Sequence, residues 1–332
     1  MEEHRPYDRP IDMSMWRTSR RLLVVVLALM PIGCSSHSPL STAPDNGAVT
    51  PNTSGAASVT SSPTVVTWRR PSREAVPAIL AVDPVLKDVI VIEDGRTRPL
   101  HALDAVPADE PADVFGGIAV FGEHVYFTVW SGEPVVASIW KIPFQGGRAA
   151  KFADNAANPA ISPDGQLIAF GTPIHRLVVR EFATGRERVV DVGGLGTIRW
   201  SPDGRRIAIT SWGEDASFVR LVNVDATELR VGEQWGNRAL GSPVWLDNET
   251  LLATDTSGGG TNSPPFIVDV PSLRTTRLEG WPYFSCLDVS RSSGRLLGIV
   301  QQGSSPGGLQ ISGPEGQIET LPISVSYAQW AD

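Results

Sequence analysis

The tetrapeptide Ser162-Pro163-Asp164-Gly165 occurs again as Ser201-Pro202-Asp203-Gly204, 39 residues further along the chain. Each copy is followed by an apolar run, Leu167 to Phe170 after the first and Ile207 to Ile209 after the second. Pro, Asp and Gly between two such runs are typical of a tight turn that joins two strands. Self-similarity at a period of about 40 residues is typical of a stacked or radial repeat. The sequence therefore predicts a β unit that is used more than once.

Hairpin tips extend this period over most of the chain. Gly or Asp, which supply the positive φ or the side-chain cap that tight turns need, occur at most of these tips, which are residues 91–95, 144–147, 182–185, 224–227, 270–273 and 313–316. Their spacing of roughly 38–51 residues is the length of a four-stranded propeller blade. No helical periodicity is sustained after Val65. We therefore expect an all-β domain, a six-bladed β-propeller.

The two ends of this region predict how the ring closes. Residues 326–332 match the opening strand of a blade, yet no further strands follow them. The missing strands are present at the other end, in residues 78–82 and 88–92. A blade shared between the N- and C-terminal strands would remove the open edges. Trp200, Trp245 and Trp330 occupy equivalent places in their repeats, so we expect them to pack between sheets.

The Ser-Pro-Asp-Gly turns, each followed by a strand of the Ile-Ala-Phe kind, resemble the WD-like repeats of TolB-type β-propellers. The resemblance covers roughly residues 75–332 and is best at Ser162 and Ser201. It implies a propeller in the bacterial envelope. It implies no particular role, because this fold carries scaffolds, enzymes and ligand-binding proteins alike.

The N-terminal part predicts export and anchoring. Residues 1–33, with the start at Met1, Met13 or Met15, read as a signal peptide, because arginines precede a short apolar stretch. Pro31-Ile32-Gly33-Cys34 resembles a bacterial lipobox with Pro31 in place of the usual Leu, which implies lipidation of Cys34. Residues 34–64, rich in Ser, Thr, Pro and Ala, predict a disordered tether, and residues 65–332 the propeller. We expect an extracytoplasmic bacterial lipoprotein that touches the membrane through its lipid anchor alone.

Composition and spacing argue against several functions. The net charge of −8 over 332 residues is a poor match for nucleic acid. The histidines His101, His124 and His175 are scattered without metal-ligand spacing, so we expect no metal and no cofactor. Residues 303–307 match Gly-x-Ser-x-Gly, but Pro306 lacks the N–H that an oxyanion hole needs after its serine. We assign no catalytic residue and expect a monomeric propeller.

The connections opposite the Ser-Pro-Asp-Gly turns are the best indication of function, because we expect them to be longer and more irregular than the turns. They include residues 130–133, 173–175, 212–215, 234–238, 255–265 and 280–283. They combine aromatic residues with Gly, Asn and acidic residues, a composition typical of binding surfaces. We predict a binding module for an envelope protein, a peptide or an envelope polymer. Its expected contact residues are His175, Trp212, Glu214, Asp215, Trp235, Trp281 and Tyr283.

Two other interpretations remain open. A ring brings distant residues together at its axis, so a lyase or hydrolase with a composite site in the axial channel is possible. Such a site would need His175 within hydrogen-bond reach of Glu133, Glu214 or Asp255. The third interpretation is a structural subunit of an envelope complex.

Overall fold

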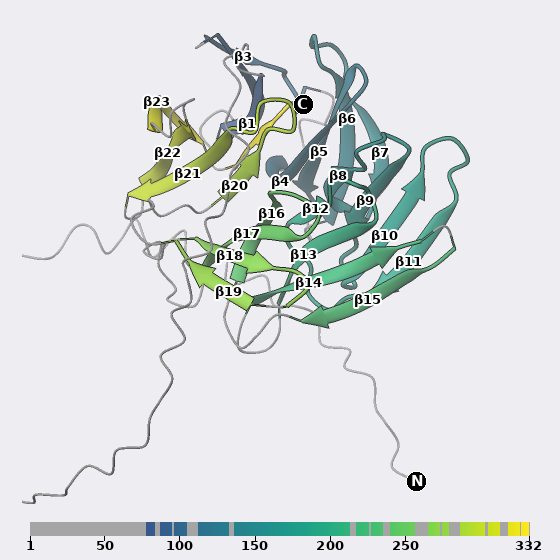
Figure 1. Ribbon diagram of the computed structural model, residues 1–332. Helices are drawn as coiled ribbons and strands as arrows, with labels where there is room; N and C mark the ends of the chain where they lie inside the picture. Colours follow the sequence, from purple (N-terminus) through teal and green to yellow (C-terminus); the bar gives the residue numbers. More distant parts are fainter. Residues whose placement is uncertain are drawn as a thin grey trace, which may run out of the picture. The chain divides into compact units, whose positions relative to one another are not determined.

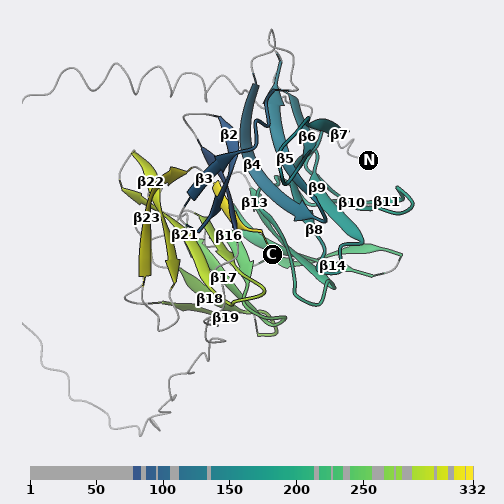
Figure 2. The same ribbon diagram turned by 90° about the horizontal axis from the view of Figure 1, so that it is seen from above.

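All regular structure in the described part of the chain is β-strand. The structure is a computed structural model and describes residues 78–331, apart from gaps at 84–86, 95, 105–111, 133–135, 213–216, 226, 235–239, 256–264, 273, 279–285, 303–304, 313–317 and 326. Its strands form antiparallel four-stranded sheets, six in number, which surround a common centre (Figures 1 and 2). The predicted six-bladed β-propeller is thereby confirmed. No helix in this part of the chain could cross a membrane.

Each sheet is one blade, which extends from an inner strand near the centre to an outer strand at the rim. In that order, blades 1 to 3 are β24 (Tyr327–Trp330), β1 (Ile79–Asp83), β2 (Asp88–Glu93) and β3 (Arg96–Pro99); β4 (Ala112–Phe121), β5 (His124–Ser131), β6 (Val136–Pro143) and β7 (Ala150–Asp154); β8 (Ala157–Ile161), β9 (Leu167–Gly171), β10 (Arg176–Glu181) and β11 (Glu187–Asp191). Blades 4 to 6 are β12 (Ile198–Trp200), β13 (Arg206–Trp212), β14 (Ser217–Val224) and β15 (Leu229–Gln234); β16 (Leu240–Trp245), β17 (Thr250–Asp255), β18 (Phe266–Asp269) and β19 (Arg274–Arg277); β20 (Cys286–Val289), β21 (Leu296–Gln302), β22 (Ser305–Ser312) and β23 (Ile318–Val325). The first strand of each blade contacts the first strands of both neighbouring blades.

The ring closes through blade 1, which contains strands from both ends of the described region. Strand β24 pairs antiparallel with β1, with Ile79 opposite Trp330 and Val82 opposite Tyr327. The backbone N–H of Ala331 continues the seam and donates to the carbonyl of Ala78 at 2.9 Å. The predicted shared blade is therefore confirmed, and neither strand is left with a free edge at the seam.

The core lies between blades rather than inside one sheet. Strand β1 shows why its residues 79–82 are all apolar: Ile79 and Ala81 pack toward blade 6, whereas Leu80 and Val82 pack toward blade 2. Successive side chains of a strand point to opposite faces, so a strand covered on both faces is apolar throughout. Four further interblade clusters of this kind join the remaining neighbours and complete the ring.

The three equivalent tryptophans are buried, as expected. Trp200 donates its indole N–H to the carbonyl of Ala160 in the preceding blade at 3.0 Å. Trp245 donates its indole N–H to the backbone carbonyl of Arg199, also in the preceding blade, at 3.1 Å. Trp330 is 2% exposed and packs in the cluster between blades 6 and 1. Their positions repeat because each one fixes a blade to its predecessor. The prediction that they belong to the core is confirmed.

Candidate binding face and axial channel

Side-chain hydrogen bonds within each Ser-Pro-Asp-Gly turn stabilise the turn. Ser162 Oγ donates to Asp164 Oδ1 at 2.6 Å, and the same oxygen accepts the N–H of Gln166 at 3.0 Å. Gly165 has a φ of +70°, which glycine adopts without steric cost. The bond from Ser162 and then that from Gln166 lower the pKa of Asp164 below its ordinary value. The carboxylate therefore serves the turn, as the sequence predicted.

The second copy of the turn also fastens two blades together. Ser201 Oγ donates to Asp203 Oδ1 at 2.6 Å, and the N–H of Asp203 donates to Asn248 Oδ1 in blade 5 at 2.9 Å. Partial burial raises the pKa of Asp203. The bonds from Ser201 and the Arg205 N–H, with the charges of Arg206 and Arg205, outweigh this effect and lower the pKa overall.

These turns define one face of the ring, which we call the turn face. It holds the connections from third to fourth strand in every blade and those from first to second strand in blades 2 to 6. The other connections lie at the opposite end, which we call the loop face. The connections of the turn face span two to six residues between described strands. The three longest connections of the ring leave from the loop face and span 12, 10 and 8 residues, at 100–111, 256–265 and 278–285.

The expected asymmetry between the two faces thus depends on three connections. The connections near Trp130 and His175, which the sequence suggested as long, span four residues each, at 132–135 and 172–175. The 12-residue connection at 100–111 is the longest and was not among the segments singled out from the sequence. It lacks Trp and Tyr, and its length becomes apparent once β3 and β4 are known.

The structure describes two of the seven expected contact residues, Trp212 and His175. Trp212 ends β13, at the loop-face end of that strand. Five others lie outside the described residues, in connections whose preceding strands β13, β15 and β19 all end at the loop face: Glu214, Asp215, Trp235, Trp281 and Tyr283. Their role as contact residues stays a prediction.

His175 is described and occupies a tight turn on the loop face. Its φ is +62°, its N–H donates to the carbonyl of Thr172 at 3.0 Å, and its own carbonyl accepts the N–H of Val192 at 3.2 Å. The backbone of His175 therefore shapes the β9–β10 turn. The acidic partners considered for a composite catalytic site, Glu133, Glu214 and the side chain of Asp255, lie outside the described residues.

A polar cluster that the sequence did not reveal crosses the inner ring. Arg199 on β12 donates from Nη2 to Tyr327 Oη on β24 at 2.9 Å, and its Nε lies 3.8 Å from Asp288 Oδ1 on β20. The side chains of Arg199 and Asp288 are each 12% exposed. The other carboxylate oxygen of Asp288 accepts the N–H of Trp330 at 2.8 Å.

This cluster, Arg199, Asp288 and Tyr327, joins the inner strands of blades 4, 6 and 1. Cation and carboxylate compensate each other at a site with little water, which supports a strut between blades more directly than a reactive group. Among the described residues, no three His, Cys, Asp or Glu side chains gather closely enough to hold a metal ion. A charged residue within a short inner strand, such as Arg199 beside Trp200, is the signal that could have indicated the cluster.

Comparison with known proteins shows the fold. No protein-family model and no curated protein sequence matches the chain. Among solved structures, TolB from Acinetobacter baumannii matches with a TM-score of 0.57 and 12% identity, over 76% of this chain and 66% of TolB. A chain of a nidogen/laminin complex matches with a TM-score of 0.57 and 16% identity, over 77% of this chain and 98% of its own length.

A third structure, a puromycin hydrolase S511A mutant complexed with PGG, matches with a TM-score of 0.50 and 15% identity. That match covers 79% of this chain but 48% of the hydrolase, so the chain spans about half of the hydrolase's length. Identities this low show a shared architecture and no shared activity. By its six four-stranded blades and its shared closing blade, the chain is a six-bladed β-propeller, and its fold is similar to that of TolB.

Proposed function

We propose that the mature protein is a lipid-anchored extracytoplasmic binding module whose loop face binds an envelope protein, a peptide or an envelope polymer. The observation that carries this proposal is the position of the three longest connections, all of which leave from one end of the ring. Long connections on a rigid scaffold are where recognition residues usually lie. Two of them, at 256–265 and 278–285, are among the segments singled out from the sequence, and the second contains Trp281 and Tyr283.

The closed ring supports this proposal because its β1–β24 seam and its interblade clusters fix the strand ends from which the connections leave. A preorganised surface loses less conformational entropy on binding than a flexible one. The aromatic residues of the expected contact set would then contribute large contact area at a small entropic cost.

The structural neighbours fit a binding role without assigning a partner. One match belongs to a complex of nidogen with laminin, which is an assembly of proteins. TolB is the other match of equal TM-score. We therefore place a protein or peptide ahead of a polymer as the first partner to test.

Photo-crosslinking tests the loop face directly. A photoreactive amino acid at Trp281 or Tyr283 should give a discrete adduct in intact cells, and the same amino acid at exposed Val189 on the outer strand β11 should not. Combined alanine replacement of Trp235, Trp281 and Tyr283 should remove binding of the partner identified in that adduct. Equal adducts from Val189, or binding that survives the triple replacement, would overturn the proposal.

Anchoring is tested separately. The Cys34→Ala variant should move from the membrane fraction to the soluble extracytoplasmic fraction, because the acyl chains attached at Cys34 would supply the membrane affinity. Mass spectrometry of the mature N-terminus should find the lipid on Cys34 of the unchanged chain. An unmodified Cys34 in a membrane-bound protein would contradict the anchor and leave the loop-face proposal standing.

A further inference from the structure

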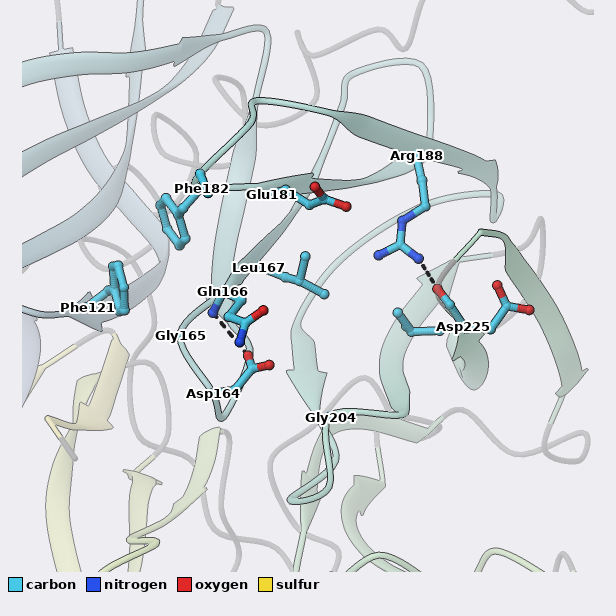
Figure 3. A pocket seen from close by; sticks show the side chains of 12 residues that line it. Phe121, Asp164, Gly165, Gln166, Leu167, Glu181, Phe182, Arg188, Gly204 and Asp225 are labelled. Atoms are coloured by element: carbon cyan, nitrogen blue, oxygen red, sulfur yellow. Dashed lines mark hydrogen bonds between the residues drawn. The ribbon is translucent and has the colours of Figure 1, made fainter.

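The turn face carries a cleft that is lined by residues of blades 2, 3 and 4. It has a volume of about 690 Å³ and is shown in Figure 3. Blade 3 contributes its Ser-Pro-Asp-Gly turn with Leu167 and its hairpin tip with Glu181 and Phe182, and blade 4 contributes Asp225. This cleft, which we call the turn-face cleft, lies at the opposite end of the ring from the loop face.

One wall of the cleft is aromatic. Phe121 at the end of β4 is 36% exposed and stacks on Phe182, with ring centroids 4.7 Å apart and planes 16° apart. Phe182 also contacts Tyr126 and Phe152, at centroid distances of 5.9 and 6.2 Å. The wall is therefore held in place by a larger aromatic cluster, while Phe121 still offers surface to a ligand. The face of an aromatic ring attracts a flat, apolar or cationic group.

The charges around the cleft are mainly negative. Asp164, Glu181 and Asp225 line it, against a single lining cation, Arg188. Arg188 donates from Nη1 to the backbone carbonyl of Asp225, which directs its charge toward the blade 4 hairpin (Figure 3). The turn hydrogen bonds lower the pKa of Asp164 and of Asp225, which keeps both ionised at neutral pH.

Two of these carboxylates retain binding capacity. The bonds of Asp164 with Ser162 and Gln166 use Oδ1, and Thr184 donates to Glu181 Oε2 at 2.8 Å. Within the described part of the chain, Asp164 Oδ2 and Glu181 Oε1 accept no hydrogen bond. Figure 3 shows the carboxylates of Asp164 and Glu181 on either side of Leu167, with that of Glu181 turned toward Arg188 rather than toward the Phe pair. A cation that enters here would meet unused acceptors and an apolar surface together.

We propose that the turn-face cleft binds an arginine side chain of a partner protein. The guanidinium group is planar, stacks on aromatic rings and donates several hydrogen bonds to carboxylates, whereas its three-carbon stem can cover apolar surface such as Leu167. Charge complementarity favours this occupant over an acidic or neutral segment. The site is additional to the loop face, and its residues are distinct from the expected contact set.

The test uses the full mature chain and a matched pair of peptides. The probe is N-acetyl-Gly-Arg-Gly-amide, and its control is the same peptide with citrulline, which has nearly the same shape and no charge. With glycine amides labelled by ¹⁵N, the arginine peptide should shift Gly165 and Gly204 in the cleft and leave Gly308 in blade 6 unchanged. Equal shifts from the citrulline peptide would overturn the proposal, as would the absence of a shift at Gly165 up to the solubility limit of the arginine peptide.

Two substitutions give effects of opposite sign. Glu181→Gln keeps an acceptor for Thr184 but removes the charge. It should weaken binding of the arginine peptide about two- to fivefold, the range of an exposed ion pair. Arg188→Gln should strengthen it by a similar factor, because it removes the competing cation. Glu319→Gln on β23 of blade 6 is the control and should change nothing. Weaker binding by the Arg188 variant, or equal binding by the Glu181 variant, would contradict the site. Neither result bears on the loop-face crosslinks.

Discussion

Ile79 and Trp330 lie opposite each other across the seam between β1 and β24, although they are 251 positions apart in the chain. Both side chains are buried, at 2% exposure, in the cluster between blades 6 and 1. The backbone N–H of Trp330 is also held by Asp288 of blade 6. The closing strand is therefore fixed on two sides, by pairing with β1 and by packing and hydrogen bonding to the preceding blade.

Trp330→Ala should reduce the free energy of unfolding by about 3–5 kcal/mol, the usual loss for truncating a large buried aromatic residue. Chemical denaturation followed by tryptophan fluorescence and far-UV circular dichroism measures this value. Ile318→Ala is the control, because Ile318 is 47% exposed on the outer strand β23 and should cost less than about 0.5 kcal/mol. Similar losses for the two variants would mean that the seam does not limit stability.

A double-mutant cycle tests the strut between Arg199 and Asp288. Arg199→Met and Asp288→Asn should each cost about 1–3 kcal/mol of unfolding free energy, because each leaves a half-paired group in a nearly buried place. Asn still offers an oxygen to the N–H of Trp330, so the seam bond is kept. The pair should show a coupling energy of about 0.5–3 kcal/mol. Additive losses would show that the contact at 3.8 Å contributes no coupling.

The turn carboxylates predict how stability depends on pH. The pKa of Asp164 and that of Asp203 are lower in the folded protein than the ordinary 3.8. A lowered pKa in the folded state stabilises the fold above the unfolded value, and this contribution is lost as the pH falls through the folded value. We therefore expect stability to fall below about pH 4, and to fall less steeply in the Asp164→Asn, Asp203→Asn double variant. Unfolding curves at pH 7, 4 and 3 measure the difference; identical slopes would contradict it.

The blades could be predicted because the residues that form each turn and each strand lie close together in the sequence. In the Ser-Pro-Asp-Gly turn, Ser162 and Asp164 are close enough in the sequence for their side chains to form a hydrogen bond. Gly165, the next residue, adopts the positive φ of the turn. The seam required one further step, the match of a lone terminal strand with strands at the other end. The core positions of Trp200, Trp245 and Trp330 could be predicted from their equivalent places in the repeats, and all three are buried.

The polar cluster of the inner strands and the turn-face cleft could not be predicted in this way. Arg199 meets Tyr327 across 128 positions, and that contact depends on how three blades are inclined around the ring. Phe121 and Phe182 come from different blades, so no periodicity in one repeat brings them together. In both cases, the sequence shows the side chains as ordinary strand and turn residues, and the ring geometry gives them their neighbours.

A pair of glycine substitutions separates backbone strain from the contact that shapes the cleft. Gly165 and Gly185 both have a φ of +70°, so alanine at either should cost roughly 1–2 kcal/mol for the left-handed conformation. A Cβ at Gly165 would lie 2.2 Å from Phe121 Cε2, whereas one at Gly185 would meet nothing within 4 Å. Gly165→Ala should therefore lose more stability than Gly185→Ala and should alter the near-UV circular dichroism of the Phe121–Phe182 stack. Equal losses with an unchanged aromatic signal would show that Phe121 moves aside freely, and the aromatic wall would then not be the fixed surface that an arginine side chain needs.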